Sequence, residues 1–140
     1  MKISIASDHG GFRLKESIVS LLKEQGYEVV DHGTNSAESV NYPDYARVVT
    51  DDIAAGRSEF GILICGTGIG MSMAANRNNR IRAAVCCNEY SARMSREHNN
   101  ANILCLGERV IGPGLAAEIV TAWLRTEFAG GRHLQRIRMF

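Results

Sequence analysis

Short apolar runs alternate with segments of helical periodicity along the whole chain. The apolar runs cover residues 3–7, 27–31, 60–65, 81–87 and 103–107. Each of them is too short for a helix and ends in small or polar residues, a pattern typical of buried β-strands. The hydrophobic pattern therefore predicts five buried strands.

Helical spacing fills the intervals between these runs. Leu14, Ile18, Leu21 and Leu22 recur every three or four positions, and Gly26 follows them as a helix stop. Further helices are predicted from Pro43 to about Gly56 and over residues 69–77, 89–98 and 114–128. Only the segment after Gly130 falls outside the alternation of strand and helix.

Strict alternation of strand and helix indicates parallel strands joined by right-handed crossovers. A chain of 140 residues, 45% of them hydrophobic, has room for one compact domain. We therefore predict a single α/β domain over residues 1–140, doubly wound and Rossmann-like, with a five-stranded parallel sheet covered by helices on both faces. In such sheets the ligand lies beyond the carboxyl ends of the strands, where the strand order reverses.

The charge balance narrows the class of partner. Sixteen Lys and Arg residues against fifteen Asp and Glu residues give a formal net charge of +1, which supplies no broad field for nucleic acid or an anionic membrane. No apolar run approaches the roughly 18 residues of a membrane-spanning helix. The first residues also lack the apolar core of a signal peptide, so we expect a cytoplasmic protein.

Four cysteines are present, but no CxxC spacing occurs. This argues against a zinc site and against a dithiol redox protein. Cys86, Cys87 and Cys105 are expected to be buried structural thiols. Cys65 differs from them because it directly precedes a glycine-rich loop that opens a helix, where a thiolate is stabilised. It could then act as a base or nucleophile.

The loop after Cys65 reads Gly66, Thr67, Gly68, Ile69 and Gly70. Glycines in this position let backbone N–H groups converge on an anion at the helix N-terminus. The simpler alternative is a tight turn between strand and helix. A dinucleotide site is a weaker interpretation because the spacing is GxGxG rather than GxGxxG, although Glu89 lies about 20 residues further on, where a ribose ligand is found in that motif.

Other polar residues suited to chemistry fall at strand ends, at a helix end and near the C-terminus. They are Asp8, His9, His98, Asn99, Arg109, Arg132 and Arg136. We expect those at strand ends and in the adjoining loops to gather at the carboxyl edge of the sheet, with His98 and Asn99 among them. Some of them also have a structural alternative: His98 as a capping residue, His9 in a loop hydrogen bond, and Arg132 with Arg136 as basic residues that complement a helix C-terminus. Arg109, just after the last strand, is the stronger phosphate candidate. His32 and His133 are expected to be ordinary surface residues.

Taken together, these residues describe a thiolate base, a backbone anion cradle, a proton-donating histidine and arginines that suit a phosphate. Nothing in the sequence suggests a metal or another cofactor. Proton transfer next to a carbonyl, with the cradle stabilising an enediolate, needs only these groups.

At this point the sequence resembles the ribose-5-phosphate isomerase type B family, which includes the subunits of galactose-6-phosphate isomerase. The resemblance covers nearly the whole chain and rests on five motifs in order. They begin at Ser7 (SDHGGF), Asn41 (NYPDYA), Gly61 (GILICGTGIG), Ser95 (SREHN) and Gly130 (GGRHLQR).

The resemblance implies interconversion of ribose 5-phosphate and ribulose 5-phosphate through a cis-enediol, a step of the pentose phosphate pathway, without metal or coenzyme. It implies that Cys65 is the base, that residues 66–70 hold the enediolate with the Thr67 hydroxyl, and that His98 opens the sugar ring. It assigns sugar and phosphate binding to Asp8, His9, Asn99 and Arg109. It also implies a homodimer, or a tetramer, with shared sites, in which the segment 130–140 carries Arg132 and Arg136 to the partner subunit's phosphate.

Two alternatives remain open at this stage. One is an isomerase of a six-carbon sugar phosphate, such as allose 6-phosphate or galactose 6-phosphate, because the sequence does not expose the depth of the pocket. The other is a non-catalytic module that binds a sugar phosphate or a nucleotide, which would need the anion cradle and the arginines but neither Cys65 nor His98.

Overall fold

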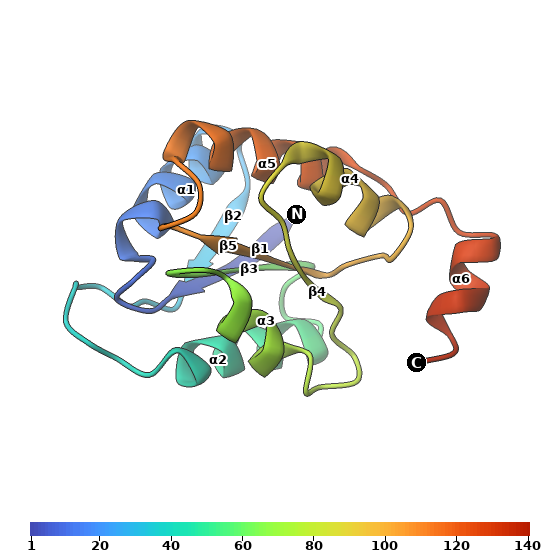
Figure 1. Cartoon of the computed structure of the whole chain (residues 1–140), viewed down its shortest axis with the longest axis horizontal. Coiled ribbons are helices and arrows are strands. Elements are labelled where there is room, and N and C mark those ends of the chain that lie inside the picture. The colour runs from blue at the N-terminus through green and yellow to red at the C-terminus, as the bar shows by residue number, and fades with distance from the viewer.

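The strands form one parallel sheet in the order β2-β1-β3-β5-β4 (Figure 1). The computed structural model describes all residues from Met1 to Phe140. The strands are β1 (Lys2–Ser7), β2 (Glu28–Asp31), β3 (Phe60–Cys65), β4 (Ala83–Val85) and β5 (Ile103–Gly107). The helices are α1 (Phe12–Glu24), α2 (Tyr42–Ala54), α3 (Ile69–Ala75), α4 (Glu89–Glu97), α5 (Pro113–Arg125) and α6 (Arg132–Ile137). The predicted α/β fold with five parallel strands is confirmed.

Two helical layers enclose the sheet (Figure 1). Helices α1, α4 and α5 cover one face, where a core cluster of 19 buried residues includes Ile5, Ile62 and Trp123. Helices α2 and α3 cover the other face over a smaller cluster of 10 buried residues that includes Val49 and Met71. Because both faces are covered, the central strands β1, β3 and β5 are apolar along almost their full length, which is why each appears in the sequence as a continuous apolar run.

The strand order reverses between β1 and β3. From β1 the chain passes through α1 to β2 on one side, and from β3 it passes through α3 to the other half of the sheet. In open α/β sheets ligands bind beyond the carboxyl ends of the strands at such a reversal of strand order, so the loops that follow β1 and β3 are the candidate site.

The β4 region departs from the prediction. A strand is expected over residues 81–87, but β4 includes only Ala83–Val85 and pairs only with β5. Because β4 is the edge strand, a single neighbour determines how far its ladder extends. The cysteines that follow lie outside the strand: Cys86 is buried, and burial raises its pKa to about 11, whereas Cys87 is exposed. The expectation that Cys87 is a buried thiol is wrong.

Helix ends also differ from the pattern. Helix α5 ends at Arg125 rather than near residue 128, and a short helix, α6, follows the two glycines Gly130 and Gly131, both of which have positive φ. No residue of α6 is buried. This explains why no hydrophobic periodicity marks it in the sequence.

A buried polar network ties β1, the end of β2 and α2 together. Asp52 accepts hydrogen bonds from Ser4 Oγ (2.6 Å) and Arg57 Nε (2.8 Å), and His32 Nε2 lies 2.7 Å from its Oδ2 atom. Burial by itself raises the pKa of Asp52, but these hydrogen bonds and the charge of His32 outweigh burial and lower the pKa to about 2. His32 is thus part of this network, and its assignment as an ordinary surface residue is wrong.

None of the helices has the length and the apolar character that a membrane-spanning helix needs.

Candidate active site

Cys65 is the last residue of β3, at the carboxyl edge of the sheet. Its thiol is 6% exposed, and the backbone N–H of Gly68 donates a hydrogen bond to Sγ at 3.1 Å. The chain makes this contact because Gly68 adopts a φ of 80°, a left-handed conformation that turns the loop back over the strand end. This backbone donor holds the Cys65 sulfur at the start of the glycine-rich loop.

The glycine-rich loop then leads into α3. The Ile69 N–H donates to Thr67 Oγ1 at 3.2 Å, which leaves the hydroxyl proton of Thr67 free to donate elsewhere. Gly70 lies against the Tyr42 ring, because a Cβ placed at Gly70 would be 2.8 Å from Tyr42 Cζ. Sequence reasoning assigned no role to Tyr42, although its neighbour Pro43 marked the start of a helix. The structure places this aromatic ring at the rim of the loop.

The loop after β1 lies beside the glycine-rich loop. Asp8 is 7% exposed, and its Oδ1 atom accepts the Gly10 N–H at 2.8 Å. A Cβ placed at Gly10 would be 3.1 Å from the Gly66 nitrogen, so the two backbones run in close contact. His9 accepts the Val40 N–H on Nδ1 at 3.2 Å, and therefore presents Nε2 as its protonated nitrogen when neutral. Asp8 and His9 thus adjoin the loop that follows Cys65, as predicted.

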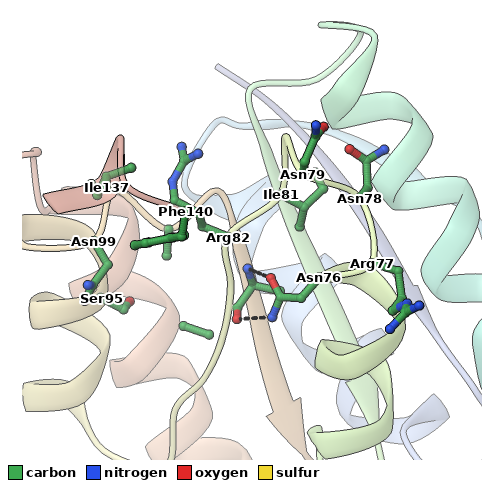
Figure 2. A pocket seen from close by; sticks show the side chains of 13 residues that line it. Asn76, Arg77, Asn78, Asn79, Ile81, Arg82, Ser95, Asn99, Ile137 and Phe140 are labelled. Carbon is green, nitrogen blue, oxygen red and sulfur yellow. Dashed lines mark hydrogen bonds between the residues drawn. The ribbon is translucent and has the colours of Figure 1, made fainter. Parts of the chain in front are cut away.

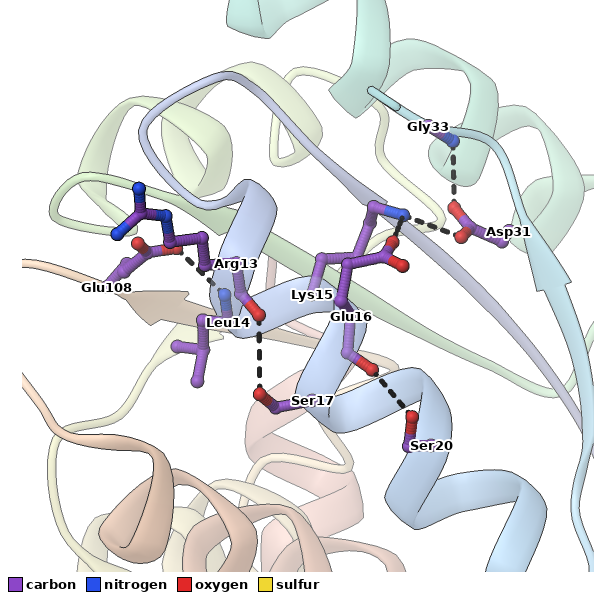
Figure 3. Close-up of polar contacts among 9 residues, drawn as sticks. All are labelled: Arg13, Leu14, Lys15, Glu16, Ser17, Ser20, Asp31, Gly33 and Glu108. Atoms are coloured by element: carbon purple, nitrogen blue, oxygen red, sulfur yellow. Dashed lines mark hydrogen bonds and ion pairs between the residues drawn. The ribbon is translucent and has the colours of Figure 1, made fainter. Parts of the chain in front are cut away.

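Arg109 approaches from the end of β5. Its N–H donates to the Gly66 carbonyl at 3.0 Å, and its Nη1 atom would lie 3.2 Å from a Cβ at Gly66. The preceding residue, Glu108, donates its N–H to the Cys65 carbonyl and accepts the Leu14 N–H on Oε2 at 2.9 Å (Figure 3). Glu108 thereby accepts a backbone N–H of the first turn of α1, and it connects the ends of β3 and β5 to the start of that helix. No local sequence pattern indicates this role of Glu108, because Glu108 and Leu14 are 94 positions apart.

A buried lysine fixes the end of β2 to α1. Lys15 has a fully buried side chain, and its Nζ lies 2.6 Å from Asp31 Oδ2 and 2.8 Å from Glu16 Oε1 (Figure 3). The other oxygen of Asp31 accepts the Gly33 N–H at 2.9 Å. Gly33 in turn accepts the Ser7 N–H at 2.7 Å. This chain of contacts holds the carboxyl edge of β1 and β2 in place.

The remaining predicted site residues lie elsewhere. His98 and Asn99 follow the C-terminal end of α4, and Arg132 and Arg136 are on α6. A crossover helix runs antiparallel to its strands, so the end of α4 lies at the amino-terminal edge of the sheet, opposite Cys65 (Figure 1). The expectation that His98 and Asn99 join Cys65 at the carboxyl edge within one chain is therefore wrong.

These residues form a second group of their own. The His98 and His133 rings stack with centroids 4.2 Å apart and an interplanar angle of 10°. Loss of contact with water lowers the pKa of His133, and the positive charges of His98, Arg132 and Arg136 lower it further. His133 is at the surface, as expected, but its ring belongs to this group through the stack with His98. Arg132 and Arg136 are both exposed and occupy positions i and i+4 of α6.

A cavity of about 570 Å³ lies beside this second group (Figure 2). Ser95 on α4 and Asn99 just after that helix line it, and Ile137 and Phe140 line it from the C-terminal segment. None of the residues around Cys65 contributes to its wall. No group of three or more His, Cys, Asp or Glu side chains is arranged to hold a metal ion. The chain thus carries two sets of reactive residues at opposite edges of one sheet.

Comparison with known proteins assigns this arrangement to a family. A family model described as Ribose/Galactose Isomerase matches residues 3–140. The chain belongs to the ribose/galactose isomerase family. The resemblance inferred from the five motifs is confirmed.

Relatives of this isomerase family match along nearly their full length. The ribose-5-phosphate isomerase B of Escherichia coli is 52% identical over 136 residues, which cover 97% of this chain and 91% of the relative. The D-erythrulose-4-phosphate isomerase of Pectobacterium atrosepticum is 46% identical over 132 residues, covering 94% and 87%. Among solved structures, the ribose-5-phosphate isomerase B of Clostridium thermocellum is 57% identical with a TM-score of 0.98, and covers 99% of this chain and 94% of its own.

Proposed function

We propose that this chain interconverts ribose 5-phosphate and ribulose 5-phosphate, with Cys65 as the base that moves a proton between C2 and C1. The observation that carries the proposal is the Gly68 N–H donating to Cys65 Sγ at 3.1 Å, beside the loop that holds Asp8 and His9. The similarity to ribose-5-phosphate isomerase B in E. coli and in C. thermocellum supports the choice of substrate.

The reaction balances with the groups at this edge. The Cys65 thiolate takes the proton from C2 of the open-chain aldose, the electron pair forms the C1–C2 double bond, and the carbonyl oxygen O1 becomes an enediolate oxygen. Backbone N–H groups of residues 66–70 and the Thr67 hydroxyl stabilise this charge. The hydroxyl proton on O2 then moves to O1, the Cys65 thiol returns its proton to C1, and O2 becomes the carbonyl of the ketose.

The second group completes the site from a partner subunit. The Cys65 edge has one arginine, Arg109, and the opposite edge adds a second histidine and a pair of arginines at helical spacing in His98, Arg132 and Arg136. In an isologous dimer each protomer gives its second group to the other, so two complete sites form. In this arrangement Asn99 and the two arginines bind the sugar and its phosphate.

Exposed apolar side chains support such an interface. Ile69 and Met73, one turn apart on α3, are 49% and 67% exposed next to the glycine-rich loop. Met139 and Phe140, after α6, are 85% and 82% exposed. Large apolar side chains at both half-sites are typical of surfaces that a partner covers.

Proton NMR of ribose 5-phosphate in deuterated water tests this function. We expect ribulose 5-phosphate to appear together with loss of the C2 proton signal and incorporation of solvent deuterium, because a thiol exchanges its proton with water between the two transfers. A folded sample that yields neither product nor deuterium contradicts the proposal, and ligand binding without turnover would then favour a non-catalytic module.

The length of the sugar chain is decided by the same assay run with other substrates. A relative 46% identical to this chain is named for a four-carbon ketose phosphate, and the family name includes galactose. We expect the highest kcat/KM for the five-carbon phosphate. Higher kcat/KM for erythrulose 4-phosphate, allose 6-phosphate or galactose 6-phosphate would reassign the substrate while leaving the enediol chemistry in place.

A further inference from the structure

Arg96, near the end of α4, is a buried cation without an acidic partner. The residue is 7% exposed, and no carboxylate oxygen lies within salt-bridge distance of its guanidinium. Its guanidinium carbon lies 4.4 Å from the centroid of the Phe60 ring and 5.5 Å from that of Trp123. Burial lowers the pKa of Arg96, and the nearby charge of Arg82 lowers it further. Burial of a charge without a counter-ion costs free energy, so the hydrogen bonds of the Arg96 guanidinium indicate a specific structural role.

Those hydrogen bonds go to the segments that carry the second group. Nη1 donates to the Ala101 carbonyl at 2.6 Å and to Asn100 Oδ1 at 3.0 Å, and Nε donates to the Thr126 carbonyl at 3.4 Å. Asn100 has a φ of 47°, the one non-glycine residue of the chain in the left-handed region. Such a conformation persists only where the surroundings enforce it. Arg96 supplies that enforcement directly after His98 and Asn99.

The same guanidinium reaches the chain that leads to α6. Thr126 is the C-cap of α5, and three residues later the Ala129 N–H donates to the Glu97 carbonyl at 3.0 Å. The helix α6 follows, with His133 stacked on His98. One buried side chain therefore connects the two segments that bear the stacked rings.

We propose that Arg96 is a positioning residue that holds the His98–His133 pair in its stacked geometry and acts on the reaction only through that pair. The expected effect of Arg96 on kcat rests on the proposed function, whereas its expected effect on the geometry of the two rings does not. A guanidinium can do this where an ammonium cannot, because its planar fork has donors in several fixed directions at once.

The test uses the full-length protein and the variants Arg96→Met and Arg96→Lys, with Arg93→Met as the matched control. Arg93 is an exposed arginine on the same helix. Stacked rings displace each other's proton resonances upfield, and His133→Ala supplies the unstacked reference for His98. In substrate-free protein we expect Arg96→Met to lose this upfield displacement and Arg93→Met to retain it. Arg96→Lys keeps a cation near the Phe60 and Trp123 rings but cannot reach all the acceptors, and we expect it to lose most of the displacement.

Kinetics distinguish positioning from general stabilisation. We expect kcat of Arg96→Lys to fall roughly tenfold to hundredfold with a smaller change in KM, as for a misplaced catalytic group. In a His98→Ala background the same substitution should change kcat less than about twofold, because the group it positions is gone.

Folded Arg96 variants with wild-type His98 and His133 resonances would overturn the inference, and so would an undiminished effect of Arg96→Lys in the His98→Ala background. If Arg96→Met fails to fold, Arg96→Lys decides the question. The resonances are read without substrate, so a wild-type protein that isomerises nothing would contradict the proposed function and leave this test intact.

Discussion

The two groups of reactive residues are built in different ways. Around Cys65, three loops are interlocked by short backbone contacts, and Asp8, Cys65 and Lys15 are all buried within the chain. Around α6, Arg132 and Arg136 are exposed, and the helix buries no residue. The first group is a preorganised surface that needs no partner for its geometry. The second is a projecting set of exposed side chains, and this difference supports our proposal that the two groups meet between subunits.

Removing the base should have the largest effect. We expect Cys65→Ala to lower kcat by at least about a thousandfold, because it removes the proposed base that takes the C2 proton. Binding of a non-reactive sugar phosphate, measured by calorimetry, should stay within a few-fold of wild type. Cys87→Ala, which removes an exposed thiol, is the control and should leave both quantities unchanged. Substantial turnover by Cys65→Ala would mean that another residue is the base.

Breaking the ion pair between Lys15 and Asp31 tests how much the buried contacts near Cys65 contribute to the free energy of unfolding. Lys15→Met should lower the free energy of unfolding by about 3 kcal/mol, because Asp31 is left without its cation. Urea unfolding at neutral pH measures this loss. A matched substitution in the second group, Arg136→Ala, should change the free energy of unfolding by less than about 0.5 kcal/mol. Equal losses in the two variants would contradict the contrast between the groups.

The arginines of the second group should act on binding rather than on stability. Arg136→Ala should raise KM for ribose 5-phosphate about tenfold or more, since a charged hydrogen bond to phosphate is lost. Arg138→Ala, which removes a neighbouring exposed arginine with no proposed role, provides the control in the same steady-state assay. If both substitutions raise KM equally, α6 contributes only a diffuse positive charge.

The Asp52 network predicts that the free energy of unfolding depends on pH in the acid range. Asp52 has a folded-state pKa of about 2, below its ordinary value of 3.8, so its ionised form stabilises the fold above pH 4. That contribution, on the order of 1–2 kcal/mol, is lost as pH falls from about 4 to 2. Denaturant unfolding across this range should show a shallower decline for Asp52→Asn than for wild type. Identical slopes would mean that Asp52 does not titrate as proposed.

Much of the fold follows directly from the sequence. Central strands buried on both faces give unbroken apolar runs, so β1, β3 and β5 are predictable within a residue or two. The edge strand β4 is not, because its length depends on one neighbour. The Cys65 loop is predictable because a buried run ending in glycines identifies a strand end, and strand ends meet at one edge.

The rest depends on contacts that local pattern does not encode. His32 and Asp52 are 20 positions apart, and Leu14 and Glu108 are 94 apart. Neither His32 nor Glu108 can therefore be assigned a place from its neighbours in sequence. The place of His98 depends on helix direction, because α4 runs antiparallel to the strands and carries His98 to the edge of the sheet opposite Cys65.

Subunit complementation tests the central claim most directly. Cys65→Ala and His98→Ala protomers, each nearly inactive alone, are assembled together by co-expression. In mixed dimers one of the two shared sites contains both defects and the other contains neither. We predict that random assembly restores about one quarter of wild-type activity, because half of the dimers are mixed and half of their sites are intact. Activity no higher than that of the separate variants would contradict a site shared between subunits.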